Sequence, residues 1–211
     1  MLEEEYKKKI ILASASPRRS EILKKILRID FEVVKPDSCK EVQLKNPYRT
    51  VIGNSIIKAE NVYNSIKKDR LKGKKSGYTE QFLIAGFDTV VYLSRRCFGK
   101  PGSIKEAVEF LNILSGRVHI VVSGVCVLNS ISGKYRFDTD ATKVKFKKLT
   151  PEEIRGYMNR ESVLDKAGAY NIFGLGSLLV EKINGCFYNV AGLPVAKFMN
   201  LLAVFGFKVI S

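Results

Sequence analysis

The chain has 211 residues, of which 45% are hydrophobic, and its formal net charge at pH 7 is +15. This length suits one α/β domain, or one domain divided into two lobes, and the hydrophobic content is sufficient for a sizeable core. No apolar segment approaches the roughly 20 residues that a membrane-spanning helix needs, and the segment Met1–Lys9 lacks the apolar centre of a signal peptide. We therefore expect a soluble, cytoplasmic protein with no membrane partner.

The positive charge favours anionic partners, which include nucleic acids and nucleotides. Much of the excess lies between Lys67 and Lys75, which we interpret as part of a solvated surface insertion near residues 67–81. Because no nucleic-acid recognition motif accompanies the charge, nucleic-acid binding is the weaker interpretation. The four cysteines lack CxxC spacing and His119 is the single histidine, which disfavours a zinc site and a disulfide framework. We expect His119 to be a buried structural residue.

Hydrophobic patterning predicts strands and helices that alternate along one domain, with an antiparallel pair of strands in the middle. Helix starts are marked by Pro17 and by capping-box patterns at Ser103 and Thr150. The predicted strands are 9–13, 31–34, 82–85, 90–93, 118–129, 135–147, 178–183 and 208–210. The predicted helices are 18–27, 47–66, 103–114, 150–159 and 194–205.

The first group of candidate functional residues lies where the strand at 9–13 meets the next helix. Ser14, Ser16, Arg18 and Arg19 surround a predicted helix N-terminus, with Ser16 as the expected cap. Free backbone N–H groups, two hydroxyls and two guanidinium groups together can bind phosphate. A capped helix with two exposed arginines explains the same residues, so local sequence leaves both interpretations open.

The second group follows the predicted strand at 82–85. Asp88, placed after that strand, can hold a magnesium ion or accept a proton from water, although an aspartate that caps a turn is the commoner case. Lys100, between Gly99 and Pro101, can neutralise phosphate charge.

The third group is the segment 165–170, which is followed by Gly174 and Gly176. Small residues let the backbone approach a ligand closely, and Asp165 and Lys166 add charge. A tight glycine-rich turn is the alternative explanation.

Taken together, these segments resemble the Maf family, whose motifs occur in order along nearly the whole chain. The matching segments are LASASPRRSEIL at 12–23, GFDTVV at 86–91, GKP at 99–101, LSGRVH at 114–119, DKAGAY at 165–170 and VEKINGCFYNVAGLP at 180–194. Each motif is unspecific alone, but their joint occurrence in order is very specific.

The resemblance implies a mixed sheet with flanking helices, in two lobes around a deep cleft. It implies hydrolysis of a nucleoside triphosphate between the α- and β-phosphates with Mg²⁺ or Mn²⁺, and a homodimer. The family's proton acceptor corresponds to Asp88, and the expected metal ligands are Asp88 and Glu41. The expected substrate-binding residues are Ser14, Arg18, Arg19, Lys58, Thr89, Lys100, Asp165, Lys166 and Phe173. Asp88-Thr89 with DKAGAY resembles the members that act on dTTP and UTP rather than on 7-methyl-GTP.

Two positions depart from the family pattern. Phe173 stands where the family has a glutamine that is tied to substrate choice, and phenylalanine can neither donate nor accept a side-chain hydrogen bond. We therefore expect weaker discrimination among pyrimidines. Lys40 aligns with a glutamate that helps to hold the metal, so either Glu41 or Asp37 takes its place or metal binding is weakened. These departures motivate one alternative, a nucleotide-binding protein with impaired catalysis.

Overall fold

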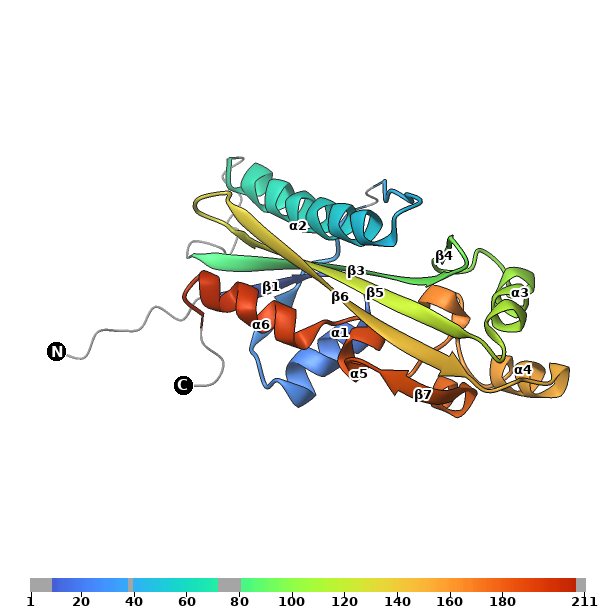
Figure 1. Cartoon of the computed structure of the whole chain (residues 1–211). Coiled ribbons are helices and arrows are strands. Elements are labelled where there is room, and N and C mark those ends of the chain that lie inside the picture. The colour runs from blue at the N-terminus through green and yellow to red at the C-terminus, as the bar shows by residue number, and fades with distance from the viewer. Residues whose placement is uncertain (1–8, 38–39, 72–80, 208–211) are drawn as a thin grey trace.

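The computed structural model describes residues 9–37, 40–71 and 81–207, which form a seven-stranded mixed sheet with helices on both faces (Figure 1). The strand order is β2-β1-β3-β5-β6-β7, and β4 also pairs with β3. The strands are β1 (Lys9–Ala13), β2 (Phe31–Val33), β3 (Phe82–Leu93), β4 (Arg96–Phe98), β5 (Val118–Asn129), β6 (Tyr135–Phe146) and β7 (Val180–Asn184). The predicted mixed α/β class is confirmed.

The helices divide between the two faces and one end of the sheet. The longest, α2 (Pro47–Leu71), lies along one face, while α1 (Pro17–Glu21) and α6 (Val195–Val204) lie on the other (Figure 1). At one end, α3 (Ile104–Leu114) packs against α4 (Pro151–Met158). The short helices are the π-helix η1 (Ile22–Ile26), the 3₁₀ helices η2 (Ala167–Ala169) and η3 (Leu175–Leu179), and α5 (Phe187–Val190).

The two predicted capping patterns both start helices. Thr150 and Glu153 form the full reciprocal capping box of α4. At α3, the Ser103 hydroxyl accepts from the Glu106 N–H at 3.2 Å, but the Glu106 carboxylate accepts from Gly102 rather than from Ser103. At α1, Ser16 makes no side-chain cap, which corrects that expectation. Its N–H donates instead to the Ser14 hydroxyl at 3.1 Å.

The separation of residues 82–85 and 90–93 into two strands is wrong, because β3 runs without a break from Phe82 to Leu93. Gly86 suggests a turn in the sequence, but in the structure it serves helix packing. A Cβ at Gly86 would collide with the Ser55 backbone oxygen on α2. The glycine therefore lets α2 lie directly against the sheet, and Asp88 sits inside a strand rather than at its end.

Other boundaries also differ from the prediction. Helix α2 continues to Leu71, so the first part of the expected loop at 67–81 is helical, and residues 72–80 lie outside the described part. Lysine is a good helix former, and Lys67 and Lys68 stay exposed on this last turn. The predicted strand 178–183 begins at Val180, after η3, and the helix at 18–27 becomes a π-helix from Ile22. The predicted strand 208–210 lies outside the described residues.

One side of β3 is paired in two separate places, and this leaves an opening in the sheet. On that side, β1 pairs in parallel as far as Ala13 with Gly86, and antiparallel β4 pairs only from Val91. On its other side, β3 pairs with β5 along almost its whole length. Residues 87–90 therefore border a gap between the end of β1 and the start of β4. Ligand sites in open α/β sheets occur where parallel strands end.

Candidate active site

A cavity of about 370 Å³ occupies this gap. It is lined by residues from segments that are far apart in the sequence. The expected site residues among them are Ser14, Arg18, Arg19, Glu41, Lys58, Asp88, Thr89, Lys100 and Asp165. The fold thus brings most of the predicted site residues to one place.

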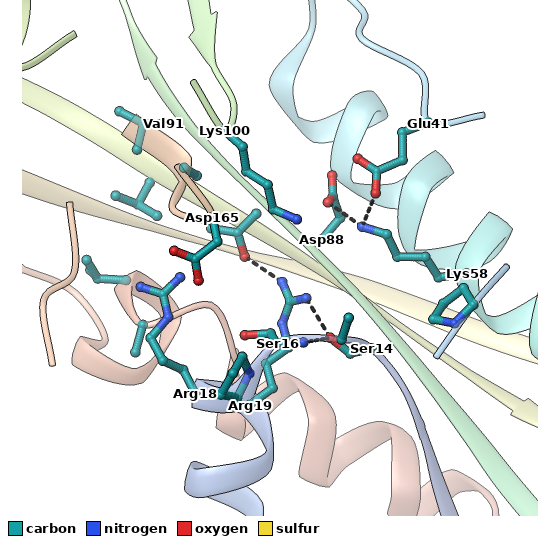
Figure 2. Close-up of a pocket in the computed structure, with 18 of the residues that line it drawn as sticks. Ser14, Ser16, Arg18, Arg19, Glu41, Lys58, Asp88, Val91, Lys100 and Asp165 are labelled. Atoms are coloured by element: carbon teal, nitrogen blue, oxygen red, sulfur yellow. Dashed lines mark hydrogen bonds and ion pairs between the residues drawn. The ribbon is translucent and has the colours of Figure 1, made fainter. Parts of the chain in front are cut away.

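Asp88 and Lys58 form the most tightly bonded pair in the cavity (Figure 2). The Lys58 ammonium lies 2.7 Å from Oδ1 of Asp88 and 2.9 Å from Oε1 of Glu41, and it donates to the Phe87 carbonyl at 3.3 Å. The side chains of Lys58 and Asp88 are each 11% exposed. Burial is the largest single influence on Glu41 and opposes its ionisation, but the charge and hydrogen bond of Lys58, with the charges of Lys100 and Arg19, together lower the pKa of Glu41. One ammonium therefore joins both carboxylates that were expected to hold metal.

Arg19 is fixed by neutral oxygens, and this leaves its charge available to the cavity. It donates to the Gly192 carbonyl at 2.8 Å, to the Ser14 hydroxyl at 3.1 Å and to the Thr89 hydroxyl at 3.1 Å. Burial lowers the pKa of Arg19 to about 10, and the nearby Asp88 raises it. Arg19 is still a cation at neutral pH, and it is held rigidly enough to position a phosphate group.

Lys100 supplies a further cation. It follows β4, and Figure 2 shows its ammonium reaching into the space between Asp88 and Arg19. The preceding residue, Gly99, accepts a hydrogen bond from Gly168 at 3.0 Å, which ties this turn to the segment 165–170.

Arg18 points to the other end of the cavity, toward Asp165 (Figure 2). Burial lowers the pKa of Arg18 and the charge of Asp165 raises it. Burial also opposes ionisation of Asp165 and is the largest single influence on it, but the hydrogen bond and charge of Lys166, with smaller contributions such as the charge of Arg18, together lower the Asp165 pKa. Arg18 donates to the Asn171 side-chain oxygen at 3.2 Å. This end thus offers a fixed donor beside a fixed anionic acceptor.

Two expected substrate-binding residues do not line the cavity. Lys166 is buried and pairs with Asp165, so it supports a cavity residue instead of facing the ligand. Phe173 packs in an aromatic cluster, 5.2 Å from Phe187 and 6.3 Å from Tyr188 between ring centroids. The expectation of weaker pyrimidine discrimination assumed that Phe173 meets the base, and its position removes that basis.

Sequence reasoning missed several residues that hold the site together. Asn54 on α2 donates to Oδ2 of Asp88 at 2.9 Å. Asn171 holds Arg18, and Ser123 on β5 lies 2.9 Å from the hydroxyl of Thr89. Asn54 lies four residues before Lys58, one helical turn away, so helical spacing was the one signal that could have suggested it.

His119 is a structural residue, as expected. It is fully buried, and its Nε2 lies 3.0 Å from the Tyr170 hydroxyl. Burial lowers the pKa of His119 to about 4. The imidazole is therefore neutral at physiological pH and lies outside the cavity lining.

The donor set suits a hard divalent cation. Magnesium is usually bound by one or two carboxylates, with water and substrate phosphates completing its shell. Asp88 and Glu41 provide two such carboxylates, which both contact the Lys58 ammonium and lie next to Arg19 and Lys100. Within the described ranges, no cluster of three or more His, Cys, Asp or Glu side chains could hold a metal by itself. The two carboxylates therefore fit a metal whose other ligands are substrate phosphates and water.

A cavity lined, among the residues that the structure describes, by four cations and four carboxylates, with Asp88 set deeply in a strand, is suited to a phosphorylated ligand and to activation of water on it. The chain belongs to the Maf-like protein family, whose sequence profile matches residues 9–205. The motif-based resemblance is thereby confirmed over nearly the whole chain.

Proteins similar to this chain include three called dTTP/UTP pyrophosphatase. The protein of Clostridium botulinum (strain Loch Maree / Type A3) is 42% identical over 200 residues, which cover 94% of this chain and 98% of that protein. The Carboxydothermus hydrogenoformans protein is 41% identical, with 94% and 100% covered. The Thermoanaerobacter sp. (strain X514) protein is 40% identical, with 92% and 95% covered. In the described part of this chain, no helix is long and apolar enough to cross a membrane.

Proposed function

We propose that this protein hydrolyses dTTP and UTP between the α- and β-phosphates, and releases the nucleoside monophosphate and pyrophosphate. The observation that carries the proposal is the Lys58–Asp88 pair at 2.7 Å, set in a cavity with Arg19 and Lys100. The similarity to proteins named dTTP/UTP pyrophosphatase, at about 40% identity over most of the chain, supports the choice of nucleotide.

In the proposed reaction, a water oxygen attacks the α-phosphorus and the bond from that phosphorus to the bridging oxygen breaks. Asp88 accepts the proton that the water loses. Asn54 holds Oδ2 of Asp88 in place, and that oxygen keeps a lone pair for the proton. Pyrophosphate leaves with its charge balanced by Arg19, Lys58 and Lys100.

We also propose that the reaction depends on Mg²⁺ or Mn²⁺, with Asp88 and Glu41 as the protein ligands. When bound, the metal neutralises charge on the phosphate oxygens and polarises the reacting phosphate. For the role of the family glutamate that Lys40 replaces, we choose Glu41 over Asp37, and the contact of Glu41 with Lys58 at 2.9 Å supports this choice. The impaired-catalysis alternative was motivated by Lys40 and Phe173, and neither residue disrupts the cavity. A homodimer remains a proposal that light scattering on the purified protein can test.

The direct test is pyrophosphate release from a panel of dTTP, UTP, CTP, GTP and ATP, with Mg²⁺, with Mn²⁺ and with a chelator. We expect release from dTTP and UTP only when a metal is present. Release of orthophosphate in place of pyrophosphate, or no release from any nucleotide, would refute the proposal.

A further inference from the structure

We propose that the Lys58 ammonium occupies the metal position between Asp88 and Glu41 until a nucleotide arrives, so that the divalent cation binds only together with the nucleotide. This inference rests on the proposed function, because it concerns the order in which that site is filled. It starts from the two short contacts of one ammonium, 2.7 Å to Asp88 and 2.9 Å to Glu41.

Burial and several contacts hold Lys58 in this position in the absence of a ligand. Its side chain is 11% exposed and also donates to the Phe87 carbonyl at 3.3 Å. It projects from α2, whose backbone touches the sheet at Gly86 and at Gly124. A side chain at either glycine would collide with the α2 backbone, so the helix has no room to shift toward the sheet. The fixed helix therefore places the Lys58 side chain beside the carboxylates, and its three acceptors hold the ammonium there until a phosphate competes for it.

Competition for the carboxylate oxygens explains why metal alone is disfavoured. The Lys58 ammonium already neutralises both carboxylates at 2.7 and 2.9 Å, so a dication that enters alone must first displace this cation. A nucleoside triphosphate brings several negative charges, which attract the dication and the ammonium together. Its phosphates also offer Lys58 a new partner, which frees carboxylate oxygens for the metal.

The experiment measures Mn²⁺ binding directly, by the loss of the free Mn²⁺ signal in electron paramagnetic resonance. Wild type is titrated alone and with α,β-methylene-dUTP, a non-hydrolysable nucleotide. Lys58→Met is titrated alone, since methionine keeps much of the length and removes the charge. Lys100→Met is the matched control, because it removes a cation of the same cavity that bridges no carboxylates. Lys58→Gln repeats the test if the methionine variant does not give a native melting curve.

We expect the nucleotide analogue to tighten Mn²⁺ binding to wild type by at least about tenfold. Without nucleotide, Lys58→Met should bind Mn²⁺ at least about tenfold more tightly than wild type does. Lys100→Met alone should stay within about threefold of wild type. Equal Mn²⁺ affinity of wild type with and without the analogue would overturn the proposal, and so would weaker binding in Lys58→Met or an equal gain in Lys100→Met. If the expected Mn²⁺ pattern appears but no nucleotide is hydrolysed, the proposed function fails while this inference stands.

Discussion

Asn54 donates to Oδ2 of Asp88 at 2.9 Å, on the carboxylate oxygen that Lys58 leaves unbonded. The same amide nitrogen donates to the Val42 carbonyl at 3.0 Å, and its oxygen accepts from the Val42 N–H at 2.8 Å. Val42 follows Glu41, so one buried side chain aligns both carboxylates of the site. A single turn of α2, from Asn54 to Lys58, thus organises the reactive end of the cavity.

Replacing Asn54 should therefore impair catalysis more than binding. We expect Asn54→Ala to lower kcat by at least about tenfold with a smaller change in KM, because Asp88 loses a fixed orientation. The lost buried hydrogen bonds should also cost about 1–3 kcal/mol in the free energy of unfolding. Steady-state kinetics and urea unfolding measure the two effects. Unchanged kcat in a folded Asn54→Ala protein would show that Asp88 needs no such support.

Asp88 itself carries the proton-accepting role. Asp88→Asn keeps the size and the hydrogen-bonding shape of the side chain but removes its basicity. We expect kcat to fall by about two orders of magnitude or more, while the affinity for UMP stays within about threefold. Asp37→Asn is the control, because Asp37 also lines the cavity but takes no part in the Lys58 cluster. Equal loss of turnover in both variants would point to a general charge effect.

Base selection should depend on Asp165 and not on Phe173. The cavity end formed by Arg18 and Asp165 offers a donor and an anionic acceptor, which match a carbonyl and the adjacent N3–H of uracil or thymine. Cytosine has no hydrogen at N3, so we expect the wild type to prefer UTP to CTP. Asp165→Asn should lower the ratio of kcat/KM for UTP over CTP by at least about tenfold.

Phe173→Gln provides the comparison for this test. Because Phe173 lies in an aromatic cluster outside the cavity lining, its replacement should leave the UTP to CTP ratio within about twofold of wild type. A ratio that changes with Phe173→Gln and not with Asp165→Asn would reverse this assignment.

His119 should make the stability of the protein depend on pH. Its pKa is lowered from 6.5 to about 4 by burial, so the folded protein keeps it neutral where the unfolded chain binds a proton. The stability that the folded protein has with a neutral His119 is fully present above about pH 6.5 and is lost as the pH falls toward 4. Between pH 7 and pH 5, protonation of this histidine in the unfolded chain should lower the free energy of unfolding by about 2 kcal/mol. His119→Gln, which does not titrate, should show a correspondingly smaller loss in urea unfolding at the two pH values; an equal loss would place the effect elsewhere.

The sequence was sufficient to predict the elements whose signals are local. Hydrophobic alternation indicated the long pair β5 and β6, and the helix-start patterns at Ser103 and Thr150 marked α3 and α4. The ordered motifs also identified the residues that meet in the cavity, from Ser14 to Asp165. Such signals depend on residues that are close in the chain, so they can be recognised without knowledge of the packing.

The errors arose where tertiary contacts decide the outcome. Gly86 indicated a turn because a glycine inside a strand is unfavourable, yet its place under α2 requires a residue without a side chain. Lys166 and Phe173 flank cavity residues in the chain but point elsewhere, because the irregular backbone around η2 has no fixed side-chain period. The roles of Asn54 and Asn171 depend on partners more than 30 and 150 residues away in the chain, respectively.

The central claim is that water attacks the α-phosphorus next to Asp88, and its most direct test is the fate of the water oxygen. The protein is incubated with dTTP and metal in ¹⁸O-labelled water, and both products are analysed by mass spectrometry. The account predicts one ¹⁸O atom in dTMP and none in pyrophosphate. Label in pyrophosphate would mean that the β-phosphorus is attacked, and it would contradict the assignment of Asp88, Lys58 and Arg19 in this cavity.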